Sequence, residues 1–262
     1  MGESRGSQID GLLVDIDGVL AVSWEPVPGA VEAIKRFRHS GLPFRLITNT
    51  TTHTRAALAD QLRKKGFEVN AHEIVTAVNA TATYLRENFP DSPTFVLTDG
   101  DPSGDMEGVR LAEAERADVI VIGGACDAFA YPVLNRVFRR VMEGAALIGM
   151  HRNLYWRTAD GLELDGGAYI AALEQAAGID ATICGKPSPT FFRSSLTLLE
   201  LSADRTAMVG DDITNDVLGA QAIGITGVLV RTGKFRESDL ARGKPDHVVD
   251  SIADVPNLFR RA

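Results

Sequence analysis

The stretch Gly11-Leu-Leu-Val-Asp-Ile-Asp-Gly-Val-Leu20 constrains the fold more than any other part of the sequence. Its apolar residues predict a buried strand of a parallel sheet, which is apolar on both faces. Side chains alternate along a strand, so Asp15 and Asp17 are expected to point the same way at the strand's end, and Gly18 permits a sharp turn there. Parallel α/β sheets bind ligands at that edge. Because two like charges this close need a cation or a shared proton, the stretch predicts a metal-assisted site. The alternative for an Asp-Gly pair is a simple turn.

Size and charge exclude several classes of protein. A chain of 262 residues suits one large domain or two moderate ones. Its formal net charge of −8 argues against a general nucleic-acid binder, because no basic surplus exists to neutralise phosphates. There is no apolar run of about 18 residues and the N-terminus lacks the apolar core of a signal peptide. We therefore expect a cytoplasmic protein with no membrane partner.

The order of apolar and polar segments predicts the domain organisation. Residues 1–10 are expected to form a mobile tail. Over residues 11–74, predicted strands and helices alternate with short links, which indicates α/β architecture with a doubly wound parallel sheet. The alternation continues over residues 75–182 without site-like residues, so this block is predicted to be an inserted α/β domain. A helix predicted over 73–89 spans its first border, and a hairpin is predicted near 155–164. Residues 183–262 complete the core.

Further polar residues follow other predicted strands. Thr48 and Asn49 end the strand after the first helix, where a hydroxyl and an amide can donate to phosphate oxygens. Both are also common helix caps. Lys186 follows a short apolar strand and Gly185, and Pro187 stiffens the exit, which favours a positioned ammonium over a merely solvated lysine.

The strand over residues 206–210 runs directly into a second acidic pair, Asp211 and Asp212, with Asp216 four residues further on. Adjacent carboxylates at a strand end need a cation, and an all-oxygen site suits Mg²⁺. Asp212 could instead cap the next helix, but capping does not explain Asp211. Carboxylates, a divalent metal, a lysine and small polar donors together suit phosphoryl transfer.

In order along the chain, these segments resemble the motifs of the haloacid dehalogenase (HAD) superfamily of phosphatases. The resemblance implies that Asp15 is the nucleophile, which forms an aspartyl-phosphate, and that Asp17 is the general acid and base. It also implies that Lys186 offsets negative charge, that Thr48 and Asn49 bind phosphate, and that Mg²⁺ is the cofactor. The ligands implied for Mg²⁺ are carboxylates of Asp15 and Asp211 and the carbonyl of Asp17. Asp216 would support the metal site, and Asp212 stays open between supporting residue and cap.

The spacing of the motifs resembles the type IIA branch of this superfamily. About ten residues separate Asp17 from the next helix, which leaves no room for a cap domain there, whereas the long interval between Asn49 and Lys186 is where that branch carries its C2 cap. Looser similarity points to the subgroup with phospholysine phosphohistidine inorganic pyrophosphate phosphatase. The resemblance implies a small phosphorylated substrate and a homodimer through the cap.

Other functions are compatible with parts of the pattern. A phosphotransferase, a phosphomutase or a dehalogenase could use the same core, and a binding or scaffold protein could retain the fold with weak catalysis. Gly123-Gly124 follows a predicted strand, but a full dinucleotide-binding fingerprint is absent. The expected function is therefore a Mg²⁺-dependent phosphatase whose substrate the sequence does not identify.

Overall fold

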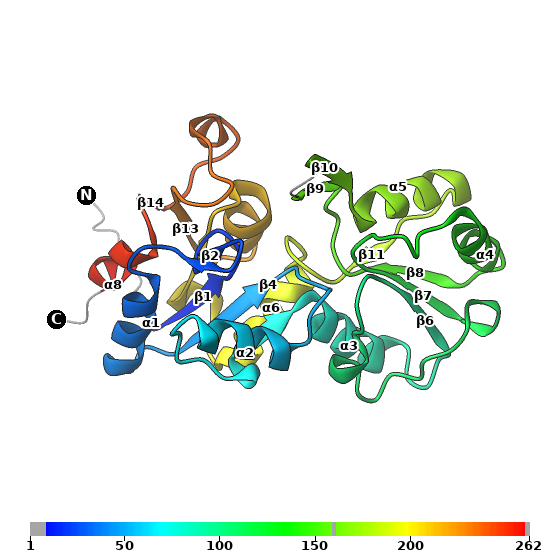
Figure 1. Ribbon diagram of the computed structural model, residues 1–262, viewed down its shortest axis with the longest axis horizontal. Coiled ribbons are helices and arrows are strands. Elements are labelled where there is room, and N and C mark those ends of the chain that lie inside the picture. Colours follow the sequence, from blue (N-terminus) through cyan, green and yellow to red (C-terminus); the bar gives the residue numbers. More distant parts are fainter. Residues whose placement is uncertain (1–8, 159–160, 260–262) are drawn as a thin grey trace. The chain divides into compact units, whose positions relative to one another are not determined.

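A computed structural model of the chain describes residues 9–158 and 161–259 (Figure 1). Residues 1–8 of the predicted tail lie outside this range, and its last two residues, Ile9 and Asp10, are buried. The chain forms two compact units. The first contains Met1–Thr48, Arg55–Val75 and Lys186–Ala262, and the second contains Asn49–Thr54 and Thr76–Gly185. Over the described residues, no helix is both long and apolar enough to cross a membrane.

The first unit is organised around a parallel sheet. Its strands are β1 (Gly11–Asp15), β2 (Ala21–Val22), β3 (Glu25–Pro26), β4 (Phe44–Thr48), β5 (Ile74–Thr76), β12 (Thr206–Gly210), β13 (Thr226–Val230) and β14 (His247–Val249). The main sheet has the order β14-β13-β12-β1-β4-β5. Val14 of β1 lies beside Val209 on one neighbouring strand and Leu46 on the other, both in parallel. Since winding reverses at β1, the predicted doubly wound sheet is confirmed.

Helices bury the faces of this sheet. They are α1 (Ala30–His39), α2 (Arg55–Lys64), α6 (Pro189–Leu199), α7 (Gly219–Gln221) and α8 (Val255–Leu258). Leu12 and Val14 of β1 belong to one apolar cluster with Ile34 and Phe37 of α1 and Leu58 of α2. Helix α6 packs against β4 and α7. Burying a large apolar side chain of this kind stabilises a fold by about 1.5–3 kcal/mol, so the packed sheet is a firm base for the residues at its edge.

The second unit contains another parallel sheet, in the order β11-β8-β7-β6, and a separate hairpin. Its elements are α3 (Ala77–Asn88), β6 (Thr94–Leu97), β7 (Val119–Ile122), α4 (Tyr131–Met142), β8 (Ala146–Gly149), β9 (Tyr155–Thr158), β10 (Gly161–Leu164), α5 (Gly166–Ala177) and β11 (Thr182–Ile183). Alternation along β7 serves both faces: Ile120 and Ile122 pack with α4 and α5, whereas Val119 and Val121 pack with α3. The antiparallel pair β9–β10 confirms the predicted hairpin.

One local prediction is wrong, and a second predicted helix is present but begins with π-helical geometry. Residues 74–76 form strand β5, and the predicted helix begins only at Ala77. The reason is a capping box, in which the Thr76 hydroxyl accepts from the Asn79 N–H while the Asn79 side chain accepts from the Thr76 N–H. In addition, the helix predicted after Asp212 starts as a π-helical segment over Ile213–Leu218 before α7.

Candidate active site

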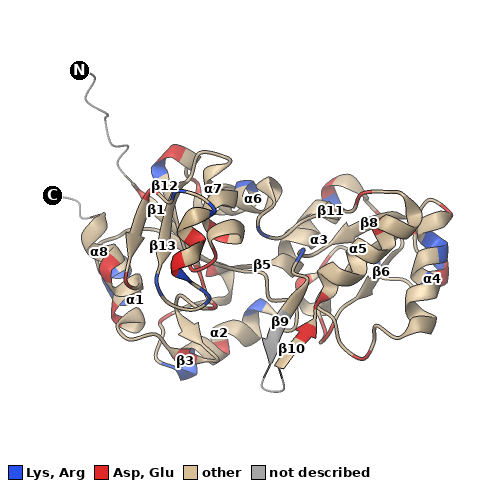
Figure 2. Cartoon of the chain, turned by 90° about the horizontal axis from the view of Figure 1, so that it is seen from above, with Lys and Arg blue, Asp and Glu red and all other residues tan. Residues whose placement is uncertain are grey.

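The site lies at the carboxyl edge of the sheet in the first unit. Asp15 is the last residue of β1, Thr48 the last of β4, and Asp211 follows β12 directly. These strands are neighbours and run in parallel, so their ends bring the side chains together. Charged residues gather on this unit near β12 and β13 (Figure 2). The structure therefore joins residues that are far apart in the sequence.

Lys186 links two of the carboxylates. Its Nζ donates to Asp15 Oδ1 and to Asp216 Oδ1, in each case at 2.7 Å. The exposed fractions are 3% for Lys186, 5% for Asp15 and 1% for Asp216, so little water reaches these charges. Burial by itself would lower the pKa of Lys186, but the carboxylates of Asp15 and Asp216 raise it by more. The pKa of Lys186 therefore lies above its usual value. Lys186 is therefore a charged ammonium held in a fixed position.

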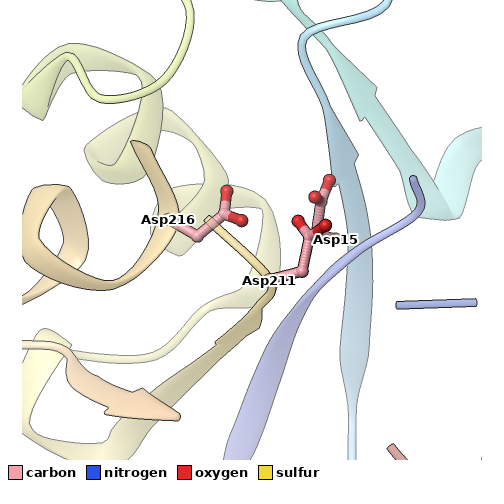
Figure 3. A group of neighbouring side chains, drawn as sticks. All are labelled: Asp15, Asp211 and Asp216. Atoms are coloured by element: carbon pink, nitrogen blue, oxygen red, sulfur yellow. The ribbon is translucent and has the colours of Figure 1, made fainter. Parts of the chain in front are cut away.

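The carboxylates of Asp15, Asp211 and Asp216 form a buried acidic group (Figure 3). One oxygen of each lies within 4.8 Å of the others. Burial, together with the nearby Asp216 carboxylate, raises the pKa of Asp15 well above its usual range and that of Asp211 to about 7. Like charges at this spacing favour either a bound cation or retained protons.

The donor set fits Mg²⁺. Asp211 Oδ2 accepts the Lys234 N–H at 2.6 Å, whereas Asp211 Oδ1 is buried and has no hydrogen-bond partner among the described residues. A buried carboxylate oxygen without a donor is costly unless a cation binds it. Because all the nearby ligand atoms are oxygens, a hard divalent ion is the cation that suits them.

Asp212 and Asp216 have different surroundings. Asp212 Oδ1 accepts the N–H groups of Thr214 and Asn215 at 2.9 and 3.0 Å, and its Oδ2 accepts from the Asn215 side chain. Both oxygens cap the π-helical segment, so these contacts are those of a helix cap, one of the two roles that the sequence leaves open for Asp212. Asp216 Oδ2 accepts the Asp212 N–H at 3.1 Å while its Oδ1 binds Lys186. Asp216 thus holds Lys186 and packs against Gly210, where a Cβ atom would lie 2.2 Å from that of Asp216.

Asp17 differs from Asp15 in exposure. Asp17 is exposed, and its Oδ2 accepts a hydrogen bond from the buried Thr48 hydroxyl at 3.2 Å. An exposed carboxylate beside a buried one can exchange protons with water, as a general acid and base must. Thr48, predicted as a phosphate ligand, therefore also contacts Asp17.

Asn49 directly follows Thr48 and belongs to the second unit. Two residues later, the Thr51 hydroxyl oxygen accepts from the Gly124 N–H at 3.0 Å and from the Thr98 hydroxyl at 3.2 Å. These contacts fix the segment after β4 within the second unit. The phosphate-binding role of Asn49 stays a prediction.

The segment after β13 belongs to the site and was missed in the sequence. The Thr232 hydroxyl donates to the Gly18 carbonyl at 2.5 Å, and the Lys234 N–H donates to Asp211. A Cβ atom on Gly18 or on Gly233 would lie 2.0 Å from Asp211 Oδ2. Both glycines also have positive φ, so a side chain at either position would be strained as well as crowded. The available signal was Thr-Gly-Lys one residue after a buried strand.

Family models match an N-terminal and a C-terminal part of the chain. The model described as haloacid dehalogenase-like hydrolase matches residues 12–112, and a second model, for HAD-hydrolase-like proteins, matches residues 183–255. Among curated proteins, the chain is 36% identical to human haloacid dehalogenase-like hydrolase domain-containing protein 2 over 250 residues, which cover 92% of this chain and 95% of that protein.

Two further relatives are phosphatases by name. The chain is 36% identical to human phospholysine phosphohistidine inorganic pyrophosphate phosphatase over 263 residues, which cover 97% of this chain and 96% of the relative. The solved p-nitrophenyl phosphatase from Archaeoglobus fulgidus has a TM-score of 0.90 and 29% identity, with 96% and 99% of the two chains covered. These similarities extend along nearly the whole chain and confirm the resemblance given by its motifs. The chain belongs to the haloacid dehalogenase-like hydrolases, and its relatives place it among the phosphatases of that family.

Proposed function

We propose that the protein is a Mg²⁺-dependent phosphatase that hydrolyses a small phosphorylated metabolite through an aspartyl-phosphate on Asp15. The observation that carries this proposal is the buried group in which Lys186 joins Asp15 and Asp216 beside Asp211 Oδ1, which accepts no hydrogen bond from the part of the chain that the structure describes. It combines a fixed carboxylate nucleophile, a fixed ammonium and a carboxylate oxygen suited to a metal ion. Positioning and charge neutralisation supply most of the catalysis in phosphoryl transfer.

The residues divide the chemistry between them. A free oxygen of Asp15 attacks phosphorus while the bond from phosphorus to the leaving group breaks. Asp17 gives a proton to the leaving group, and the same carboxylate then removes a proton from water. That water attacks phosphorus, which releases orthophosphate and restores Asp15. Asp15 Oδ1 accepts the Ile16 N–H at 2.9 Å as well as Lys186, so its orientation is fixed before substrate arrives.

The cofactor would be held by carboxylate oxygens of Asp15 and Asp211 and by the Asp17 carbonyl. When bound, Mg²⁺ would neutralise negative charge on the phosphoryl oxygens. Thr48 and Asn49 would donate to those oxygens, and Lys186 would offset the charge that develops on Asp15.

The second unit would act as the cap that selects the leaving group. Its sheet, with α4 and α5 on one face and α3 on the other, is complete in itself, as an inserted domain requires. A homodimer through this unit stays part of the proposal. The names of the relatives suggest the compounds to test: p-nitrophenyl phosphate, phospholysine, phosphohistidine and inorganic pyrophosphate.

The test is phosphate release by Asp15→Asn across these compounds, with and without Mg²⁺. We expect a loss of at least about 10³-fold, because the amide is a poor nucleophile. Asp250→Asn is the matched control, since Asp250 is exposed and, among the residues that the structure describes, forms an ion pair only with the exposed Arg231. Mg²⁺-dependent turnover that survives in Asp15→Asn, or a flat response of the wild type at high protein concentration, would contradict the proposal. The second result would favour a binding or scaffold protein.

A further inference from the structure

The buried charges of the site leave an incoming phosphoryl group without a positive partner. Asp15, Asp211 and Asp216 are nearly inaccessible to water, as is Lys186, whose ammonium is shared between two of them. The charges of one ammonium and one divalent cation equal those of the three carboxylates, so the group would carry no net positive charge. A phosphoryl dianion that enters the site therefore needs a further cation, because its loss of hydration is otherwise uncompensated.

Lys234 is an exposed cation close to this group. Its backbone N–H donates to Asp211 Oδ2 at 2.6 Å, so the residue is fixed to the acidic group by its main chain. The carboxylates of Asp211 and Asp15 act electrostatically on its ammonium. The side chain is exposed, and its ammonium forms no salt bridge with any residue that the structure describes.

Two other cations of the segment after β13, Arg231 and Arg242, are already paired. Arg231 Nη1 lies 3.3 Å from Asp250 Oδ1, and Arg242 Nη1 lies 3.7 Å from Asp239 Oδ1. Within the segment that follows β13, Lys234 differs from both arginines because its charge is near several carboxylates but is bound by none of them. This combination leaves the ammonium available to an anion.

The backbone around Lys234 is held firmly. Thr232 donates to the Gly18 carbonyl, Phe235 N–H donates to the Thr232 carbonyl at 3.3 Å, and the Phe235 ring packs on the apolar cluster of Ile213, Val217 and Leu229. Fixed backbone with an exposed cationic side chain is the arrangement expected of a binding residue, because little backbone ordering is required when the anion binds.

We propose that the Lys234 ammonium is a substrate-binding residue that contacts the anionic phosphoryl group. This inference rests on the proposed phosphatase function and extends it. Lys186 would fix the nucleophile, whereas Lys234 would supply the positive charge that the incoming dianion meets. Since an ammonium is a compact point charge, an arginine at the same position would keep the charge and much of the affinity.

The test uses inorganic phosphate as the ligand of the full-length, Mg²⁺-loaded protein, measured by titration calorimetry. We expect Lys234→Met to weaken phosphate binding about tenfold, as loss of a charge-assisted contact does. Lys234→Arg should stay within about threefold of the wild type. Lys244→Met, which removes another exposed lysine of the segment after β13, should leave phosphate binding unchanged.

Mg²⁺ binding without phosphate separates a direct role from a structural one. Removing a positive charge near Asp211 should leave Mg²⁺ affinity unchanged or increase it, while phosphate affinity falls. If Lys234→Met lost affinity for both, the residue would serve only the fold of the segment, and the inference would be overturned. Phosphate affinity within twofold of the wild type would overturn it as well. Neither of these binding measurements depends on turnover. Failure of the phosphatase proposal would appear in a different experiment, as a lack of phosphate release from the test compounds.

Discussion

Replacing Lys186 by methionine removes the cation that holds the buried carboxylates together. Lys186 donates to Asp15 and Asp216 at 2.7 Å, and all three residues are at most 5% exposed. Loss of one partner from a buried ion pair costs about 3–5 kcal/mol, because the remaining charge is left uncompensated. For a protein of this size, 1 kcal/mol corresponds to roughly 2–4 °C, so the metal-free variant should melt about 6–20 °C lower.

The loss should depend on pH and on the second carboxylate. The variant should regain stability as the pH falls, because the pKa of Asp15 is raised and its protonation removes the repulsion that Lys186 offsets. Adding Asp216→Asn to Lys186→Met should also restore part of the loss, which a double-mutant cycle would show as coupling. The assay is urea unfolding followed by circular dichroism, with Lys244→Met as the control. A Lys186→Met protein as stable as the wild type at neutral pH would refute this reasoning.

Two more predictions concern Asp211. The pKa of this carboxyl is raised to about 7 from an ordinary 3.8, so the folded metal-free protein binds a proton more tightly than the unfolded chain does. The stability of the metal-free protein should therefore fall as the pH rises from about 4 to about 7. For the same reason, Mg²⁺ should raise the melting temperature more at about pH 8 than at about pH 6. An equal effect of Mg²⁺ at both pH values would contradict this. Gly233→Ala should weaken Mg²⁺ binding at least about tenfold, because its Cβ would lie 2.0 Å from Asp211 Oδ2. Gly41→Ala is the control, since Gly41 has a similar positive φ and, apart from its chain neighbours, no described residue lies within 4 Å of its Cβ position. Unchanged Mg²⁺ affinity in Gly233→Ala would show that Mg²⁺ binding does not depend on the position of Asp211 beside this glycine.

Residues at strand ends could be predicted from the sequence. Asp15, Thr48 and Asp211 each follow a run of apolar residues, and parallel strands bring their carboxyl ends to one edge. Periodicity therefore sufficed to predict the doubly wound sheet and much of the group of side chains at its edge.

Other features depend on tertiary contacts that the pattern does not contain. Lys234 belongs to the site because β13 lies beside β12, and Thr-Gly-Lys after a strand otherwise indicates only a turn. The role of Asp212 depends on whether the next N–H groups fold back to its carboxylate, which they do. Ile74 and Val75 fit an apolar helical face as well as a strand. Because Thr76 caps the helix, the helix begins at Ala77 and these two residues lie in the strand.

The central claim is that Asp15 becomes phosphorylated and that Asp17 is needed to release the phosphate. In Asp17→Asn, p-nitrophenyl phosphate should still phosphorylate Asp15, because p-nitrophenolate leaves without a proton from the enzyme, while hydrolysis of the intermediate should slow by about 10²–10⁴-fold. The direct measurement is mass spectrometry of rapidly quenched, digested Asp17→Asn protein, with Asp15→Asn/Asp17→Asn as the control. We predict a phosphorylated peptide that contains Asp15 and is absent from the control. Phosphate release in this variant at the wild-type rate, or a phosphoryl group on any other residue, would contradict the account.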